Sequence, residues 1–425
     1  MTTAQLTRPT VQHPLWERRF TLYFTARAVS LLGDAMMPVA AALAVGALYG
    51  VSGVGAVLGA WTGTFVLLVL FGGVLSDRFG ARRMMVGADL VRVGTQGVLA
   101  AAFLAGPPPF WLLVTMASLA GAAVAMFLPG VNGMVPLVAH DPQRANATLK
   151  VADALAHLLG PALAGLLIAL TGAGAVYAID AATFLLSALC LALLRLPASP
   201  PPPRASPRSL LLDLRQGWRE FRDRPWMWSV ILVWLFYGVL LFGPLVPLGS
   251  VLIGDRLGPG TYGLAVSFLG IGTVLGGLLA LRLRPARPLA AGAAVLTLYA
   301  ALPLGVALTT SLPLLLTAHV LGGAALAFWS VMWATSVQTH TPPAVLNRVS
   351  AYELAGSISG ITLGQLLAGP ATHLASPSQL LLLSTATCLA GCAALLAVPA
   401  VRTLRRAAPG PDLPANPVDA GPRGS

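Results

Sequence analysis

Charged side chains are scarce in this chain of 425 residues: Asp, Glu, Lys and Arg make up 9% of it, against roughly a quarter in soluble domains. Such a chain cannot cover a water-facing surface, so a wholly soluble protein is excluded. Lysine occurs once, at Lys150, and no G-x-x-x-x-G-K-[ST] segment provides a phosphate-binding loop. The H-E-x-x-H pattern, the nucleophile elbow and zinc-type Cys/His spacing are also absent. No enzyme activity is therefore expected.

Cysteine is also rare, and Cys190, Cys388 and Cys392 all lie in apolar runs. Cys388 and Cys392 share a helix face at i and i+4, a spacing that is compatible with a metal or redox pair. Packing by small apolar side chains is the simpler interpretation. We therefore expect neither a metal nor a cofactor.

Apolar residues make up 56% of the chain and fall into long runs separated by short charged or Pro/Gly-rich breaks. A helix of about 20 apolar residues crosses the ~30 Å hydrocarbon core and satisfies its own backbone hydrogen bonds. The sequence therefore predicts an all-α membrane protein with twelve transmembrane helices in two sets of six. The predicted spans are 20–48, 52–76, 84–106, 110–138, 147–171, 174–195, 226–252, 260–282, 286–309, 312–339, 347–373 and 378–401.

This pattern divides the chain into two helical halves with polar segments around them. We expect a cytoplasmic N-terminal segment at 1–19, six-helix halves at 20–195 and 226–401, a cytoplasmic linker at 196–225 and a disordered cytoplasmic tail at 402–425. Within the linker, Leu210–Phe221 is compatible with a short amphipathic helix on the membrane face. The polar start leads into a span too long for a signal peptide, so no cleavable signal is expected.

Lys and Arg gather in alternate loops. They occur before the first predicted span, after the second and fourth spans, in the linker, near 282–287 and in the tail. The loops near 107–109, 172–174, 309–312 and 374–378 contain neither, and Arg256 beside Asp255 is the one departure. Because basic loops stay cytoplasmic, both termini are predicted to lie inside. The net charge of +12 therefore reflects topology, and no nucleic-acid partner is expected.

Ionisable side chains inside the spans are costly in hydrocarbon, so each is a candidate functional residue. Asp34 lies about fourteen residues into the first span, roughly 21 Å along it and close to mid-membrane. It is our preferred proton- or cation-binding carboxylate, with a purely structural carboxylate as the alternative. His157 and Glu353 are further candidates for proton or substrate coupling, although a packing histidine is the simpler interpretation of His157. No role follows from the sequence for Asp180.

Two further features lie near the predicted cytoplasmic side. Asp89 and Arg92 are three residues apart and share a helix face, which indicates a structural ion pair or an inner gate. Gly73–Arg83, GVLSDRFGARR, forms the loop after the second span, where glycines permit a tight turn and Asp77 suits the positive end of a neighbouring helix dipole.

This loop resembles the signature of the major facilitator superfamily. The matching residues are Gly73, Leu75, Asp77, Arg78, Gly80, Arg82 and Arg83, whereas Ala81 departs from the signature. The resemblance implies that the loop gates transport, and the Asp89–Arg92 pair nearby is grouped with it as a candidate inner gate. The loop would contact the start of the eleventh span near Asn347–Arg348 when the cytoplasmic side is closed.

A second segment, Leu158–Gly165 (LLGPALAG), resembles the Gly-Pro motif of the exporter branch, with Gly160, Pro161 and Gly165 matching. Gly and Pro let two helices approach and bend, which suits a rocking interface. The fourth span lacks the Arg that many proton-coupled drug exporters of this kind carry. A bacterial branch that includes the enterobactin exporter and macrolide-efflux-type proteins is similar at SLLGD (Ser30–Asp34), ADLVR (Ala88–Arg92), RANA (Arg144–Ala147) and NRVSAYELAGS (Asn347–Ser357).

The resemblance implies the major facilitator fold, in which two pseudo-symmetric six-helix halves enclose one substrate site near the midplane. It implies a secondary transporter that exports small lipophilic or amphipathic compounds, of drug or siderophore type, by proton antiport. The transporter would be a monomer in a bacterial inner membrane, in contact with membrane lipids. Uptake or lipid translocation by the same fold remains an open alternative. Candidate cavity residues are Asp34, Trp61, Phe65, Asn132, Tyr237, Phe328, Trp329, Trp333, Gln338 and Glu353.

Overall fold

Long apolar runs fold as helices here because a peptide group in hydrocarbon has no water to bond and must pair within its own segment. The computed structural model describes residues 16–139, 142–196, 222, 224–340 and 358–406. Within these ranges the regular structure is helical, without strands. Ten helical segments of the described chain are long and apolar enough to cross a membrane. The predicted all-α membrane class is confirmed.

The first helix, α1 (Arg18–Phe79), carries two predicted spans. As one straight rod its 62 residues would measure roughly 93 Å, about three times the hydrocarbon core, so the chain must reverse direction. It does so at Gly50, whose φ of 60° and ψ of −159° suit glycine alone. The neighbouring Tyr49 hydroxyl donates to the Pro108 carbonyl at 2.8 Å and ties this turn to the next turn at the same end.

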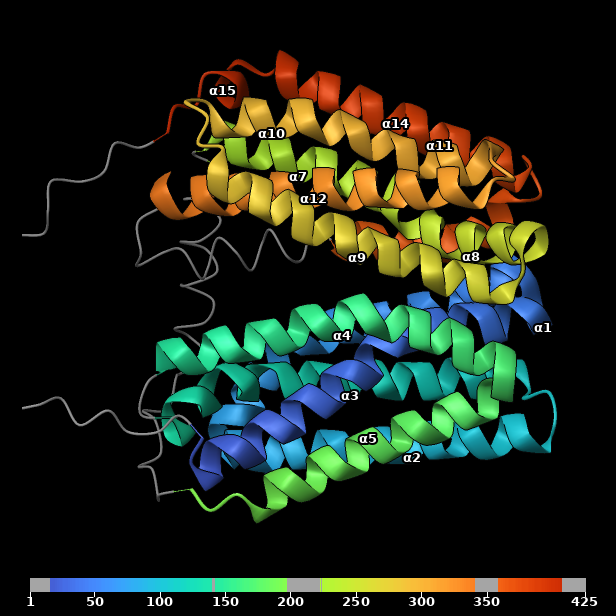
Figure 1. Cartoon of the computed structure of the whole chain (residues 1–425), viewed down its shortest axis with the longest axis vertical. Coiled ribbons are helices and arrows are strands. Elements are labelled where there is room, and N and C mark those ends of the chain that lie inside the picture. Colours follow the sequence, from blue (N-terminus) through green and yellow to red (C-terminus); the bar gives the residue numbers. More distant parts are fainter. Residues whose placement is uncertain (1–15, 140–141, 197–221, 223, 341–357, 407–425) are drawn as a thin grey trace, which may run out of the picture.

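The remaining helices of the first half follow the predicted spans closely. They pack with α1 into one bundle, coloured blue to green in Figure 1. Their bounds are α2 (Ala81–Ala105), α3 (Phe110–Val138), α4 (Pro142–Thr171) and α5 (Ala173–Leu193). The boundary at the start of α4 lies earlier than the predicted residue 147, because the helix continues through the RANA segment.

The second half forms a separate bundle, coloured yellow-green to red in Figure 1. The seventh predicted span comprises α7 (Pro225–Tyr237), the π-helical η1 (Gly238–Phe242) and α8 (Gly243–Leu257). The following helices are α9 (Pro259–Arg282), α10 (Pro288–Leu296), the 3₁₀ turn η2 (Thr297–Ala300), α11 (Ala301–Leu308), α12 (Leu312–His340), a helix over 358–371, α14 (Pro377–Ala397) and α15 (Pro399–Arg402). α10, η2 and α11 together form the ninth predicted span.

Two expectations about span limits differ from the structure or lie beyond it. The predicted span 378–401 ends at Ala397, because Val398 is extended and Pro399 cannot continue the helical hydrogen bonding. The eleventh predicted span, 347–373, is described from residue 358 onwards. The linker helix Leu210–Phe221 and the tail beyond residue 406 lie outside the described residues, and the count of twelve spans stays a prediction.

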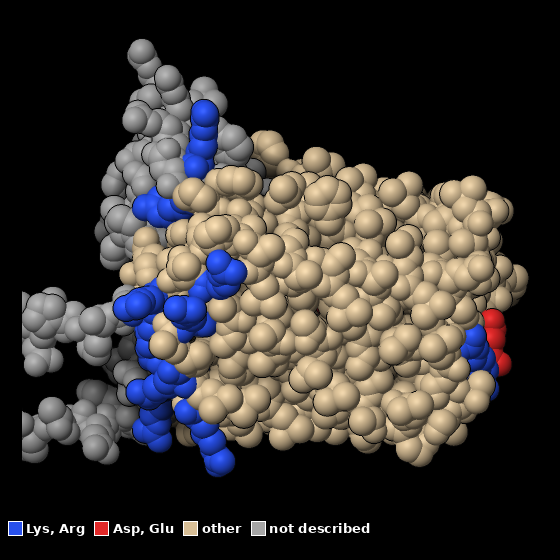
Figure 2. Space-filling view, turned by 90° about the horizontal axis from the view of Figure 1, so that it is seen from above, with Lys and Arg blue, Asp and Glu red and all other residues tan. Residues whose placement is uncertain are grey.

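Glycines bring the two halves together. A Cβ added to Gly165 on α4 would come within 3.1 Å of the Gly260 carbonyl on α9. Gly55 on α1 packs directly on the Gln365 carbonyl of the helix over 358–371. Gly55 follows the turn at Gly50, and Gly165 and Gly260 lie near the end of α4 and the start of α9, which are the helix ends remote from the basic segments. Figure 2 shows Lys and Arg gathered at one end of the bundle, beside a broad surface without charged side chains. The halves therefore touch at the end opposite the basic residues, as the ribbons in Figure 1 also indicate.

Candidate functional site

A buried arginine lies inside the first half. Arg92 on α2 is 2% exposed, and its Nη1 lies 3.5 Å from Asp34 Oδ2 on α1 and 3.6 Å from Asp89 Oδ1 on its own helix. Its guanidinium carbon lies 5.0 Å from the ring centroid of Phe127 and 4.6 Å from that of Phe184. A cation this deep needs compensating charge and ring contacts. The predicted ion pair between Asp89 and Arg92 is present, and Asp34 joins it from another helix.

The two carboxylates that pair with Arg92 differ in access. Asp89 is 0% exposed, and the Ser187 hydroxyl donates to its Oδ2 at 2.6 Å. Asp34 is 36% exposed. A proton entering from an aqueous space would therefore reach Asp34 first. Asp89 is fixed by Ser187 on α5 and serves as a buried counter-charge to Arg92.

A third carboxylate, Asp180 on α5, completes the cluster. It is fully buried and lies within electrostatic range of Asp34 and Arg92. Its Oδ2 has no hydrogen-bond partner among the described residues, and Gly33, the residue before Asp34, packs against its carboxylate. Three carboxylates thus interact electrostatically with Arg92, while a second guanidinium, that of Arg27, acts on Asp89. No role for Asp180 followed from the sequence, because the crossing of α1 and α5 cannot be read from either helix alone.

The Gly-Pro segment of α4 lies between this cluster and the other half. Gly160 faces α1, where an added Cβ would come within 3.0 Å of the Ala35 backbone, next to Asp34. The carbonyl of the next residue, Pro161, packs against Gly263 on α9. Consecutive residues of α4 therefore touch the Asp34 segment on one side and the opposite half on the other.

The loop signature contributes a turn and a helix cap. Gly80 precedes α2 with φ 86°, a left-handed conformation that requires glycine, as the tight turn predicted. Arg82 donates from Nε to the Leu191 carbonyl at 2.9 Å and from Nη2 to the Ala192 carbonyl at 2.7 Å. It thereby satisfies free carbonyls at the end of α5. Arg83 is exposed. The side chains of Gly73, Asp77 and Arg78 lie outside the described residues.

The other two coupling candidates do not join the Arg92 cluster within the described chain. His157 on α4 is 66% exposed, and its Nδ1 lies 3.0 Å from the Asp153 carbonyl and 3.8 Å from Asp153 Oδ1. It is hydrogen-bonded, as a structural histidine would be, but its ring is not packed in a core. Glu353 lies outside the described residues.

Tryptophans line a cavity in the second half. α7 and α12 border a space of about 290 Å³ whose lining residues are Val230, Ile231, Trp234, Leu326, Trp329, Ser330 and Trp333. The ring of Trp329 stacks on those of Trp234 and Trp333, with centroid distances of 5.1 Å and 6.4 Å. The lining contains no charged side chain. Trp329 and Trp333 were predicted cavity residues, whereas Trp234, one turn along α7 from Val230, was missed.

Tyr237, another predicted cavity residue, packs within the second half instead of lining this space. It is 1% exposed, and its hydroxyl donates to the Cys388 carbonyl at 2.6 Å, with Cys392 Sγ at 3.4 Å. Both cysteines are buried and free. The described chain contains no group of three His, Cys, Asp or Glu residues that could hold a metal ion. Both cysteines lie in the packed interior, on one face of α14.

The remaining cavity candidates are distributed over both halves. Trp61 and Phe65 stack at 5.9 Å on the second segment of α1. Phe328 on α12 is 1% exposed and belongs to the packed core. The side chains of Asn132 and Gln338 lie outside the described residues. The Trp cavity and the Arg92 cluster thus contain the predicted residues Trp329, Trp333 and Asp34.

Replacing Arg92 with Met is expected to destabilise the protein by about 3–5 kcal/mol, because it leaves buried carboxylates without their cation. Adding Asp89→Asn should recover part of that loss. Lys150→Met is the matched control, because its 3.9 Å pair with Asp153 is exposed and such pairs contribute about 1 kcal/mol or less. Thermal unfolding of the purified variants measures both effects, and equal unfolding temperatures for the Arg92 and Lys150 variants would contradict the cluster's structural role.

Comparison with known proteins agrees with this architecture. Residues 23–362 match the family model of the Major Facilitator Superfamily. Macrolide efflux protein A of Streptococcus pyogenes is 22% identical over 274 residues, which cover 62% of this chain and 66% of that protein. Enterobactin exporter EntS of Escherichia coli O1:K1 / APEC is 26% identical over 377 residues, which cover 82% of this chain and 84% of that protein.

Among solved structures, the nucleoside transporter NupG superimposes with a TM-score of 0.70 at 14% identity, covering 89% of this chain and 98% of that one. At this identity the likeness shows the fold alone. The family model, in contrast, spans most of the sequence, from the first helix into the helix over 358–371. The chain therefore belongs to the Major Facilitator Superfamily.

Proposed function

We propose that this protein is a secondary active transporter that exports small lipophilic or amphipathic compounds in exchange for protons. The observation that carries the proposal is Arg92, shared by the accessible carboxylate of Asp34 and the buried carboxylate of Asp89. Export is supported by the efflux proteins among its relatives. Transport needs no covalent chemistry, so no cofactor is proposed. We further propose that the protein is a monomer in a bacterial inner membrane, with both termini cytoplasmic.

Proton binding at Asp34 would act through Arg92. With Asp34 ionised, its carboxylate on α1 attracts the guanidinium on α2 across 3.5 Å. A proton on Asp34 cancels that attraction, and Arg92 keeps Asp89 as its fixed partner at 3.6 Å. Protonation thus weakens one link between two helices without leaving Arg92 unpaired. This is the property that a coupling group needs, because the change must be reversible and must not unfold the bundle.

α4 would transmit this change to the other half. Gly160 contacts α1 beside Asp34, and Pro161 contacts α9 at Gly263. The Ala162 amide also donates to the Ser267 hydroxyl on α9 at 2.9 Å. A shift of the Asp34 segment would therefore press on the helix that forms the contact between halves. Close backbone crossings of this kind permit rocking of one half against the other.

The arrangement of the halves supports an inward-facing state. The contacts between halves lie at the end opposite the basic residues, and basic segments favour the cytoplasmic side. In this assignment the cytoplasmic side is open. The loop residues Gly73–Arg83 would then act in the opposite state, when the cytoplasmic side closes.

The Trp cavity supports a lipophilic cargo. Its walls are aromatic and aliphatic, and Ser330 supplies its one hydroxyl. Ser330 already donates that hydroxyl to the Leu326 carbonyl at 2.8 Å. A sugar or phosphate would therefore lose its bonds to water without replacement, whereas an apolar or aromatic compound would gain contact area.

Asp34→Asn is expected to abolish proton-driven cargo accumulation in everted membrane vesicles. The panel would contain macrolide antibiotics and catechol siderophores, assayed with a proton gradient and after addition of an uncoupler. Asp255→Asn is the control, because Asp255 is an exposed carboxylate near the end of α8, outside the cluster and not paired with His157. It should transport normally.

Each outcome of this assay bears on a different part of the proposal. Accumulation that collapses with the uncoupler supports proton antiport. No accumulation of any compound under any gradient would contradict export, and normal transport by the Asp34 variant would contradict its coupling role.

Trp234→Ala is expected to raise the KM for an aromatic cargo about three- to tenfold, the loss of one aromatic contact. Trp228→Ala is the control, since Trp228 also lies on α7 but is 43% exposed on another face. Trp234→Phe should keep most of the affinity. Equal KM values for Trp234→Ala and Trp228→Ala would exclude this cavity as the cargo site.

A further inference from the structure

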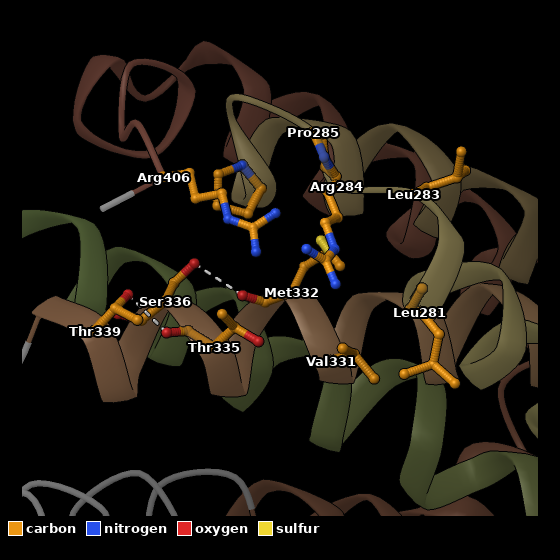
Figure 3. Close-up of a pocket in the computed structure, with 12 residues that line it drawn as sticks. Leu281, Leu283, Arg284, Pro285, Val331, Met332, Thr335, Ser336, Thr339 and Arg406 are labelled. Atoms are coloured by element: carbon orange, nitrogen blue, oxygen red, sulfur yellow. Dashed lines mark hydrogen bonds between the residues drawn. The ribbon is translucent and has the colours of Figure 1, made fainter. Parts of the chain in front are cut away.

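A second cavity lies at the basic end of the second half, apart from both features described above. It has a volume of about 280 Å³ and lies between the end of α9, the following loop, α12 and the chain after α15. The Arg406 amide donates to the Ala286 carbonyl at 2.9 Å, which fixes the end of the described chain against the loop. Figure 3 shows that Arg284 and Arg406 thereby point toward the same space above α12.

The polar groups of this cavity have unused capacity to donate. The guanidinium groups of Arg284 and Arg406 form no ion pair or hydrogen bond with any described residue. The Thr335 side chain likewise has no partner within the described chain, whereas the nearby Ser336 and Thr339 hydroxyls bond to backbone carbonyls of α12. Two full positive charges and a hydroxyl therefore converge on one space without an anion from the described protein.

The other wall of the cavity is apolar and open to the side. Leu281 is 70% exposed, Leu283 48% and Val331 37%. Leu281 and Val331 lie on helices that are long and apolar enough to cross a membrane, and Leu283 directly follows α9. In a bilayer these exposed side chains would meet hydrocarbon next to the two arginines. A free phosphate or sulfate ion would contact the arginines but make no favourable contact with this apolar wall. A molecule with an anionic head and an apolar chain would use both.

We propose that this cavity binds the head group of an anionic phospholipid, with its phosphate between Arg284 and Arg406 and an acyl chain along Leu281 and Val331. The site lies on the side that the basic residues mark as cytoplasmic, where anionic head groups attract such cations. A guanidinium pairs with a phosphate through two parallel hydrogen bonds. The proposal is independent of the exported cargo, because it requires only that this face of the protein contacts a bilayer.

Lipid binding to the purified full-length protein tests the site. Native mass spectrometry would measure the affinity for dioleoylphosphatidylglycerol, with dioleoylphosphatidylcholine as the neutral-head-group comparison. Arg284→Gln combined with Arg406→Gln should weaken phosphatidylglycerol binding about 25-fold, since each cation near an anionic head group strengthens binding about fivefold. The matched control combines Arg282→Gln with Arg405→Gln, two exposed arginines next to the cavity residues that do not line it.

The expected result is a loss confined to the Arg284/Arg406 variant, with the control binding like the parent protein. Arg284→Lys with Arg406→Lys, which keeps the charge, should retain most of the binding and shows that the loss does not come from misfolding. Equal losses in both glutamine variants would overturn the proposal in favour of a diffuse basic surface. Equal affinity for both lipids, or full displacement of phosphatidylglycerol by inorganic phosphate, would also overturn it, the latter in favour of a free-anion site.

Discussion

A guanidinium buried in a membrane bundle must keep its counter-charges, and this constraint shapes the first half of the protein. Arg92 is 2% exposed and draws Asp34 from α1 and Asp89 from its own helix, while Phe127 and Phe184 cover its faces. Asp180 lies nearby on α5 with one oxygen unpartnered among the described residues. Arg27 also acts on Asp89, so three carboxylates face two guanidinium groups in this region. The proposed proton site is the least buried of these carboxylates, Asp34.

The surrounding helices keep this cluster close to the contact between halves. Gly33 and Ala35, on either side of Asp34, lie against α5 and α4. Because Gly160 and Pro161 are adjacent, the helix that touches Ala35 also touches α9 in the other half. Side chains larger than hydrogen at these crossings would separate the helices. In the proposed mechanism, these close contacts would carry a small electrostatic change at Asp34 to the other half.

Much of the fold could be predicted from the sequence, because hydrophobic runs of bilayer length leave helices as the only solution. The turn at Gly80 and the Asp89–Arg92 pair also followed, since both depend on residues close together in the chain. The pairing of Asp34 with Arg92 and the position of Asp180 did not, because helix rotation and depth are set by packing between segments. Tyr237 illustrates the same limit: it was a predicted cavity residue, but its hydroxyl reaches the Cys388 carbonyl instead. For the cavity, the sequence pointed to aromatic residues, and the structure shows which of them line it.

Proton release on cargo binding is the most direct test of the central claim, that Asp34 exchanges a proton against cargo. If proton and cargo exclude each other, linkage requires that cargo binding expels the proton. The purified protein would be mixed with a macrolide antibiotic in weakly buffered solution, and the pH change followed with an indicator dye. The account predicts acidification with the parent protein and none with Asp34→Asn. Cargo binding without proton release by the parent protein, or equal release by both proteins, would contradict it.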